Sequence, residues 1–188
     1  AKHHQRPVGT AHAHHRPRPA FVKQRRLSKA IIARDLVGHL PRETDVRLAM
    51  ARLAERYPDT WTFALDGLVG SSPETLVSVS GGEVRARVLA GTVARGADAA
   101  EDNEAEASLL GSTKDQAEHE FAVQSVFSSL TRHSKDLARS TKPYPLKLPN
   151  LWHLATDFVG TVSDGSSSLD LIAVLHPTAA VAGTPTID

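Results

Sequence analysis

Two consecutive glycines, Gly81 and Gly82, separate two stretches rich in strand-forming residues, TLVSVS before the pair and EVRARVLAG after it. A Gly-Gly pair in this position favours a tight hairpin turn, because glycine readily adopts the positive φ angles that such turns require. The sequence therefore predicts two antiparallel strands here. It also predicts antiparallel pairing in the sheet to which they belong.

Helices and further strands are predicted around this hairpin. Apolar residues recur at helical spacing over 46–57, before Pro58, and over 113–130, after a possible N-cap at Ser112 or Thr113. A short helix is predicted at 169–175, further strands are predicted at 29–34, 61–70 and 151–162, and residues 140–150, with three prolines, are predicted to form a loop. Strand and helix do not alternate regularly. We therefore expect an α+β fold, with a largely antiparallel sheet and flanking helices.

Composition and charge bear on whether the protein binds nucleic acid, spans a membrane or lies in the cytoplasm. The 22 Lys and Arg residues balance 21 Asp and Glu residues, so total charge gives no bias toward nucleic acid or membrane. Residues 1–20 are rich in His, Pro and Arg and are expected to form a disordered tail, with one domain over 21–188. The chain has no cysteine and no apolar run of about 18 residues. We expect a cytoplasmic protein without a membrane span.

Several segments could carry chemistry, and each also has a structural interpretation. Lys29 could cap a strand end or, if desolvated, act as a base. Glu74, in GSSPETL, could be a turn carboxylate or an acid. The glycines of LAGTVARG (89–96) could form a bulge or admit a ligand close to the backbone. HPTAAVAG (176–183) could line a pocket or pack closely against another segment.

The stretch KDQAEHE (114–120) gathers charge at the start of a predicted helix. Asp115, Glu118 and His119 are spaced i, i+3 and i+4, so they project from one side of that helix. Such a run is commonly a solvated face held by weak ion pairs. The alternative is a metal site, and the spacing by itself does not decide between them.

The order of these segments resembles that of the chorismate-utilising enzymes. KAIIAR, GSSPETL, LAGTVARG, KDQAEHE, LWHLAT and HPTAAVAG follow one another as the corresponding motifs do in that family. LWHLAT, together with the lysine of KAIIAR, is most similar to the isochorismate synthases. The resemblance implies a chorismate-utilising fold in incomplete form, because the family continues well beyond the last matched motif. We therefore expect the 188 residues by themselves to have little or no activity.

The resemblance also implies roles for particular residues. Isochorismate synthases add water at C2 of chorismate and remove the C4 hydroxyl, with Mg²⁺. The roles implied here are catalytic base for Lys29, catalytic acid for Glu74, metal binding for Glu118 and Asp115, and substrate binding for Gly91, Thr92, His153 and Ala180. His119 is expected to form hydrogen bonds rather than to bind Mg²⁺, because imidazole is a poor ligand for that ion.

Two positions favour isochorismate as the product. The resemblance associates Lys29 with water, rather than ammonia, as the nucleophile, and the small Ala180 with release of isochorismate to siderophore or menaquinone synthesis. A salicylate synthase-type lyase is the first alternative. An inactive relative that acts as a binding module through its basic tail is the second. Chorismate is the expected partner, no nucleic acid or membrane is expected, and the sequence leaves the oligomeric state open.

Overall fold

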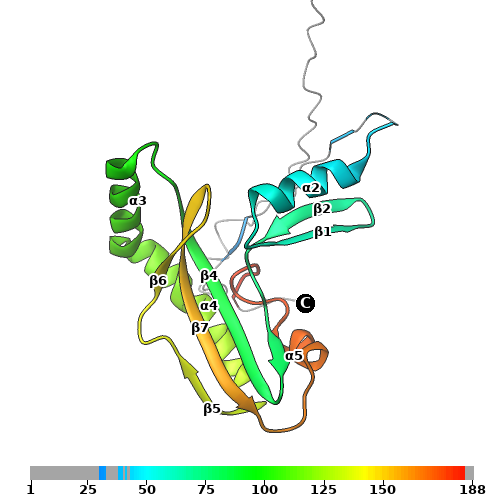
Figure 1. The fold of residues 1–188 in the computed structure, drawn as a ribbon. Helices are drawn as coiled ribbons and strands as arrows, with labels where there is room; N and C mark the ends of the chain where they lie inside the picture. Colours follow the sequence, from blue (N-terminus) through cyan, green and yellow to red (C-terminus); the bar gives the residue numbers. More distant parts are fainter. Residues whose placement is uncertain (1–29, 33–37, 40, 42, 185–188) are drawn as a thin grey trace, which may run out of the picture.

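The computed structural model describes residues 30–32, 38–39, 41 and 43–184, and its centre is a five-stranded antiparallel sheet (Figure 1). The strand order is β3-β4-β7-β5, and β6 also pairs with β7. The strands are β3 Ser78–Ser80, β4 Glu83–Ala94, β5 Ser134–Arg139, β6 Tyr144–Lys147 and β7 Leu151–Val162. Their pairing confirms the α+β class with an antiparallel sheet.

No helix among the described residues is both long enough and apolar enough to cross a membrane.

The two longest strands, β4 and β7, lie side by side across the middle of the molecule (Figure 1). The turn between β3 and β4 is the predicted one, with φ angles of +58° at Gly81 and +82° at Gly82. Helix α4 (Thr113–Leu130) packs on one face of the sheet, and α5 (Ser168–Leu175) packs beside it. The core between these layers contains the buried residues Val84, Ala86, Val88, Ala90, Ala122, Val123, Val126, Leu130, Phe158, Leu171 and Leu175.

A smaller layer is formed by helix α2 (Val46–Arg56) and the hairpin of β1 (Trp61–Leu65) and β2 (Leu68–Ser72) (Figure 1). The prediction of one strand over 61–70 is therefore wrong. Asp66 and Gly67 have φ angles of +47° and +83° and form a two-residue turn inside that segment. An Asp-Gly pair between strand-forming residues is itself a hairpin signal, so the turn follows from local sequence.

Three other predictions need correction. Residues 140–150 are not all loop, because β6 lies within them; Pro145 is tolerated there since β6 is an edge strand paired only with β7. TLVSVS forms a strand only over Ser78–Ser80, since the paired register of β3 with β4 covers those residues alone. Ala30–Ile32, the described part of KAIIAR, is not in a strand, and Ile32 is largely exposed.

Helix α3 (Ala99–Gly111) is a further element that the predictions lack. Its N-cap Asp98 accepts hydrogen bonds from the backbone N–H groups of Ala100 and Glu101. It buries only Asp102 and Leu109, so it has no apolar stripe to reveal it. The predicted helices α2, α4 and α5 are confirmed, as is the strand over 151–162. The predicted tail, residues 1–20, lies outside the described residues.

Candidate functional site

The strand β4 is irregular at Gly91, within the LAGTVARG segment. Its pairing with β7 shifts register between Ala90 and Thr92, and Gly91 has a φ angle of +78°. A Cβ atom placed on Gly91 would lie 3.1 Å from Asp115 Cβ and 3.3 Å from Leu154 Cδ1. The structure confirms the bulge at this position, and the segment that approaches the Gly91 backbone closely is α4.

Gly91→Ala is expected to lower the free energy of unfolding by more than the positive φ angle at this position would alone explain. Gly165 is a matched control, because it has the same φ angle of +78° and no neighbouring atom within 4 Å of an added Cβ. We expect Gly165→Ala to cost about 1–2 kcal/mol for the left-handed conformation. Gly91→Ala should cost a further ~1–3 kcal/mol for the contacts with α4 and β7. Urea denaturation of both variants measures the difference, and equal losses would contradict the close approach.

Thr92 and His153 face each other directly across β4 and β7 at this bulge. His153 Nδ1 lies 2.9 Å from Thr92 Oγ1 and 3.3 Å from the carbonyl oxygen of Gly91. A carbonyl only accepts, so Nδ1 carries the proton and Nε2 is the accepting nitrogen. Burial lowers the pKa of His153, opposed by the hydrogen bond to Gly91. Gly91, Thr92 and His153, three predicted substrate-binding residues, are therefore in contact around a neutral imidazole.

Glu74 approaches the same strand from the segment that follows β2. The Leu89 backbone N–H, two residues before the bulge, donates a hydrogen bond to its carboxylate. Burial raises the pKa of Glu74, and this hydrogen bond opposes the increase. The backbone N–H of Glu74 donates to Ser72 Oγ at 3.2 Å, which fixes the turn of GSSPETL. A raised pKa is the direction that an acid catalyst requires, and its role stays a prediction.

The acidic cluster lies on the first two turns of α4, which Ser112 caps by accepting from the Asp115 backbone N–H. Lys114 Nζ is 3.6 Å from Asp115 Oδ1 and 3.9 Å from Glu118 Oε2, so both carboxylates lie near one cation. Their side chains are 21% and 33% exposed. Two accessible carboxylates fit the small number of protein ligands that Mg²⁺ uses while it keeps its waters. Within the described ranges, no three His, Asp or Glu side chains are grouped to hold a metal ion.

His119 is completely buried and connects α4 to both long strands. Its Nδ1 donates to the carbonyl oxygen of Ala90 at 3.1 Å, and its Nε2 accepts from Thr156 Oγ1 at 2.8 Å. Burial lowers the pKa of His119, opposed mainly by the hydrogen bond to Ala90. The expectation that His119 forms hydrogen bonds is confirmed. This histidine fixes the acidic turns of α4 beside the Gly91 bulge.

Two predicted site residues remain, Lys29 and Ala180. Lys29 lies outside the described residues. Ala180 packs against the core beside α4, and its backbone N–H donates to Thr178 Oγ1 at 3.3 Å. It lines neither of the two cavities described below. For HPTAAVAG, the structure therefore favours close packing over a pocket lining.

A cavity of about 290 Å³ lies next to His153, between the small layer and the turn that joins β6 to β7. Its lining includes Pro73, the residue before Glu74. The other lining residues are Leu53, Tyr57, Thr60, Ser71, Leu148, Pro149, Asn150 and Leu151. No role was predicted for these residues, although Ser71 and Pro73 lie in GSSPETL and residues 148–150 lie in the proline-rich segment 140–150.

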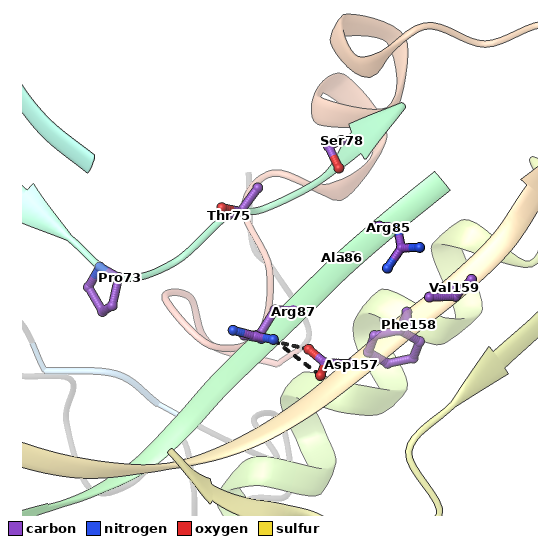
Figure 2. A pocket seen from close by; sticks show the side chains of 9 residues that line it. All are labelled: Pro73, Thr75, Ser78, Arg85, Ala86, Arg87, Asp157, Phe158 and Val159. Atoms are coloured by element: carbon purple, nitrogen blue, oxygen red, sulfur yellow. Dashed lines mark hydrogen bonds and ion pairs between the residues drawn. The ribbon is translucent and has the colours of Figure 1, made fainter. Parts of the chain in front are cut away.

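A second cavity, of about 370 Å³, lies on the face of β4 and β7 away from α4 (Figure 2). Figure 2 shows Arg87 and Asp157 pointing toward each other there, with Nε–Oδ1 and Nη2–Oδ2 distances of 2.6 and 3.2 Å. Tyr144 donates to Asp157 at 2.7 Å. These charged groups satisfy one another, and no predicted site residue lines this cavity. We therefore assign the candidate site to the smaller cavity and the adjoining bulge.

Comparisons with known proteins show the family to which the chain belongs. The profile of the family described as chorismate binding enzymes matches residues 19–188. Isochorismate synthase DhbC of Bacillus subtilis is 37% identical over 172 residues, which are 85% of this chain and 43% of that protein. Among solved structures, DhbC of Bacillus anthracis, assigned as a 2,3-dihydroxybenzoate-specific isochorismate synthase, has a TM-score of 0.76 at 32% identity, over 88% of this chain and 47% of its own.

The menaquinone-specific isochorismate synthase MenF of Escherichia coli is a third similar protein. Its structure has a TM-score of 0.64 at 29% identity, over 72% of this chain and 32% of its own. The chain thus spans less than half the length of the relatives that it matches.

Proposed function

Because the chain belongs to the chorismate-binding enzymes, we propose that it supplies part of the active site of an isochorismate synthase, with chorismate as the substrate. One observation carries this proposal. Thr92 contacts His153 at the Gly91 bulge of β4, which Asp115 of α4 approaches closely, and Glu74 is bonded to Leu89, two residues before the bulge. His153 lines a cavity of about 290 Å³. Perturbed ionisable groups beside a cavity are typical of catalytic sites.

The proposed reaction exchanges one hydroxyl group for another. Water adds at C2 and gives a proton to a base, the ring double bonds shift, and the C4 hydroxyl leaves as water after it receives a proton. We propose Glu74 as the donor of that proton, since burial raises its pKa. Lys29 is the proposed base on the strength of its motif. His153 and the Gly91 backbone are proposed to orient the ring hydroxyl and the substrate carboxylate.

A divalent cation is part of the proposal. Asp115 and Glu118 are proposed to hold Mg²⁺, which when bound would neutralise a substrate carboxylate. Lys114, which lies near both carboxylates, would turn outward as its exposed side chain permits. The buried His119 keeps these carboxylates beside the bulge.

Two further aspects are proposals. The higher structural similarity to the 2,3-dihydroxybenzoate-specific protein than to the menaquinone-specific one supports a role in siderophore rather than menaquinone synthesis. A cytoplasmic location is consistent with a chain that has no cysteine.

Chorismate binding that depends on Mg²⁺ is the direct test. In calorimetric titrations of the 188-residue protein, we expect chorismate to bind about tenfold more tightly in Mg²⁺ than in EDTA. Glu118→Gln should remove that difference, because it takes away one proposed ligand. Glu120→Gln is the matched control: it lies on the same helix, its side chain is 50% exposed, and it contacts Arg139 instead.

Two results would refute the proposal: chorismate binding with the same affinity in Mg²⁺ and in EDTA, or no binding at all. Product analysis of a version extended to the length of the relatives separates the alternatives. Isochorismate supports the synthase, and salicylate with pyruvate supports the lyase.

A further inference from the structure

Asp102 is a buried carboxylate on α3 that the proposed chemistry does not use. Its side chain is 9% exposed, accepts three hydrogen bonds and forms an ion pair with Lys147. To Oδ1, Arg95 Nε donates at 2.5 Å, Trp152 Nε1 at 2.9 Å and the Gly96 backbone N–H at 3.2 Å. Lys147 Nζ lies 3.3 Å from Oδ2. A carboxylate tolerates such burial only when its oxygens are paired in this way.

The partners of Asp102 also contact one another. Arg95 Cζ and Lys147 Nζ lie 5.3 and 5.1 Å from the centroid of the Trp152 ring, within the range of cation–π attraction. Trp152 is itself buried, against Leu109 and Leu154. We refer to Arg95, Asp102, Lys147 and Trp152 as the Asp102 cluster. Its four members come from α3, β6, β7 and the residue after β4.

This cluster holds one wall of the candidate cavity. Arg95 Nη1 donates to the carbonyl oxygen of Leu148 at 3.0 Å, and the Arg95 backbone N–H donates to that of Asn150 at 3.2 Å. Leu148 and Asn150 belong to the turn between β6 and β7, and both line the cavity. Trp152 directly precedes His153, so the same contacts fix the strand that carries the imidazole.

We propose that Asp102 is a positioning residue for the candidate site: it fixes the 148–151 wall and the orientation of His153 toward Gly91 and Thr92. Asp102 lines neither cavity and acts only through the other members of the cluster. The effect on chorismate binding rests on the proposed function, whereas the effect on His153 does not. The two parts can therefore be tested separately.

The test is Asp102→Asn, which keeps the shape of the side chain and removes its charge. We expect the imidazole signals of His153 in ¹H–¹⁵N NMR spectra to shift, because Nδ1–H no longer points reliably at the Gly91 carbonyl. The signals of His119, which lies outside the cluster, should stay where they are. Chorismate affinity in Mg²⁺ should fall about tenfold, as expected when binding groups are displaced.

Asp157→Asn is the matched control, since Asp157 is also held by an arginine and by an aromatic donor, but away from the candidate cavity. It should leave both the His153 signals and chorismate affinity unchanged. If Asp102→Asn does not fold, Lys147→Met tests the same point, because Lys147 is 55% exposed. It should give changes in the same direction, about threefold in affinity.

Unchanged His153 signals in the folded variant would overturn the positioning role. Equal shifts of the His153 and His119 signals would also overturn it, because they would indicate a general loosening of the protein. If wild-type protein binds no chorismate while the His153 signals respond as expected, the positioning role stands and the proposed function fails. If chorismate binds equally well to Asp102→Asn and to wild type, the positioning role fails alone.

Discussion

Replacing His119 with leucine is expected to lower the free energy of unfolding by about 2–5 kcal/mol, measured by urea denaturation at pH 7. The variant leaves the Ala90 carbonyl and the Thr156 hydroxyl buried without the partners that they have in wild type. It also places an isobutyl group in a space shaped for a planar ring. His133→Leu is the control, since His133 is partly exposed and pairs with Asp164 near the surface. Its loss of stability should be much smaller.

His119→Gln should restore much of the loss, because an amide can donate to one partner and accept from the other. It also allows a test of the pKa. The unfolded chain takes up a proton on His119 near pH 6.5, whereas burial keeps the folded side chain neutral to lower pH. The stabilisation is therefore complete above pH 6.5 and is lost as the pH falls below it. Between pH 7 and 5, wild type should lose more stability than His119→Gln. Parallel curves would contradict a buried neutral imidazole.

Glu74→Gln is expected to reduce isochorismate formation by about 10²–10⁴-fold, in a version of the protein extended to the length of its relatives. Glutamine keeps the size of the side chain but cannot give a proton to the leaving hydroxyl. Glu83→Gln is the matched control, because Glu83 is exposed at the start of β4 and pairs with Arg85. It should retain wild-type turnover.

The pH profile adds a second criterion for Glu74. An acid must be protonated to act, so the rate should fall as the pH rises through the raised pKa of this carboxyl group. Turnover by Glu74→Gln close to that of wild type would exclude this residue as the acid. Loss of turnover together with loss of chorismate binding would instead assign it to substrate binding.

The elements that the sequence predicts correctly are those with local signals. Gly81 and Gly82 mark the hairpin, Ser112 caps α4, and β7 is a long run of strand-forming residues. The missed elements depend on distant partners instead. Strands β5 and β6 exist because β7 offers them one open edge, and α3 buries little besides Asp102 and Leu109. These elements lack the regular spacing of apolar residues from which helices and strands are predicted.

In the candidate site, too, some parts could be predicted from local sequence and others could not. Motif order predicted roles for Glu74, Gly91, Thr92 and His153, and the pairing of β4 with β7 brings the last three together. The cavity wall at 148–151 and its support by Asp102 could not be predicted. They arise from contacts between segments about 50 residues apart, such as Trp152 with Asp102. Lys29, the proposed base, lies outside the described residues and stays a prediction.

The single extra residue at Gly91 reverses the odd–even alternation of β4. Arg87 and Leu89 lie opposite Asp157 and Ala155, whereas after the glycine it is the even-numbered Thr92 that lies opposite His153. Deleting Gly91 would therefore do more than shorten the strand. It would remove the bulge and with it the Gly91 carbonyl oxygen, which lies 3.3 Å from His153 Nδ1, whereas Thr92 would follow Ala90 directly and still lie opposite His153. A family member that lost this residue would therefore keep the threonine–histidine pair and lose the backbone acceptor beside it.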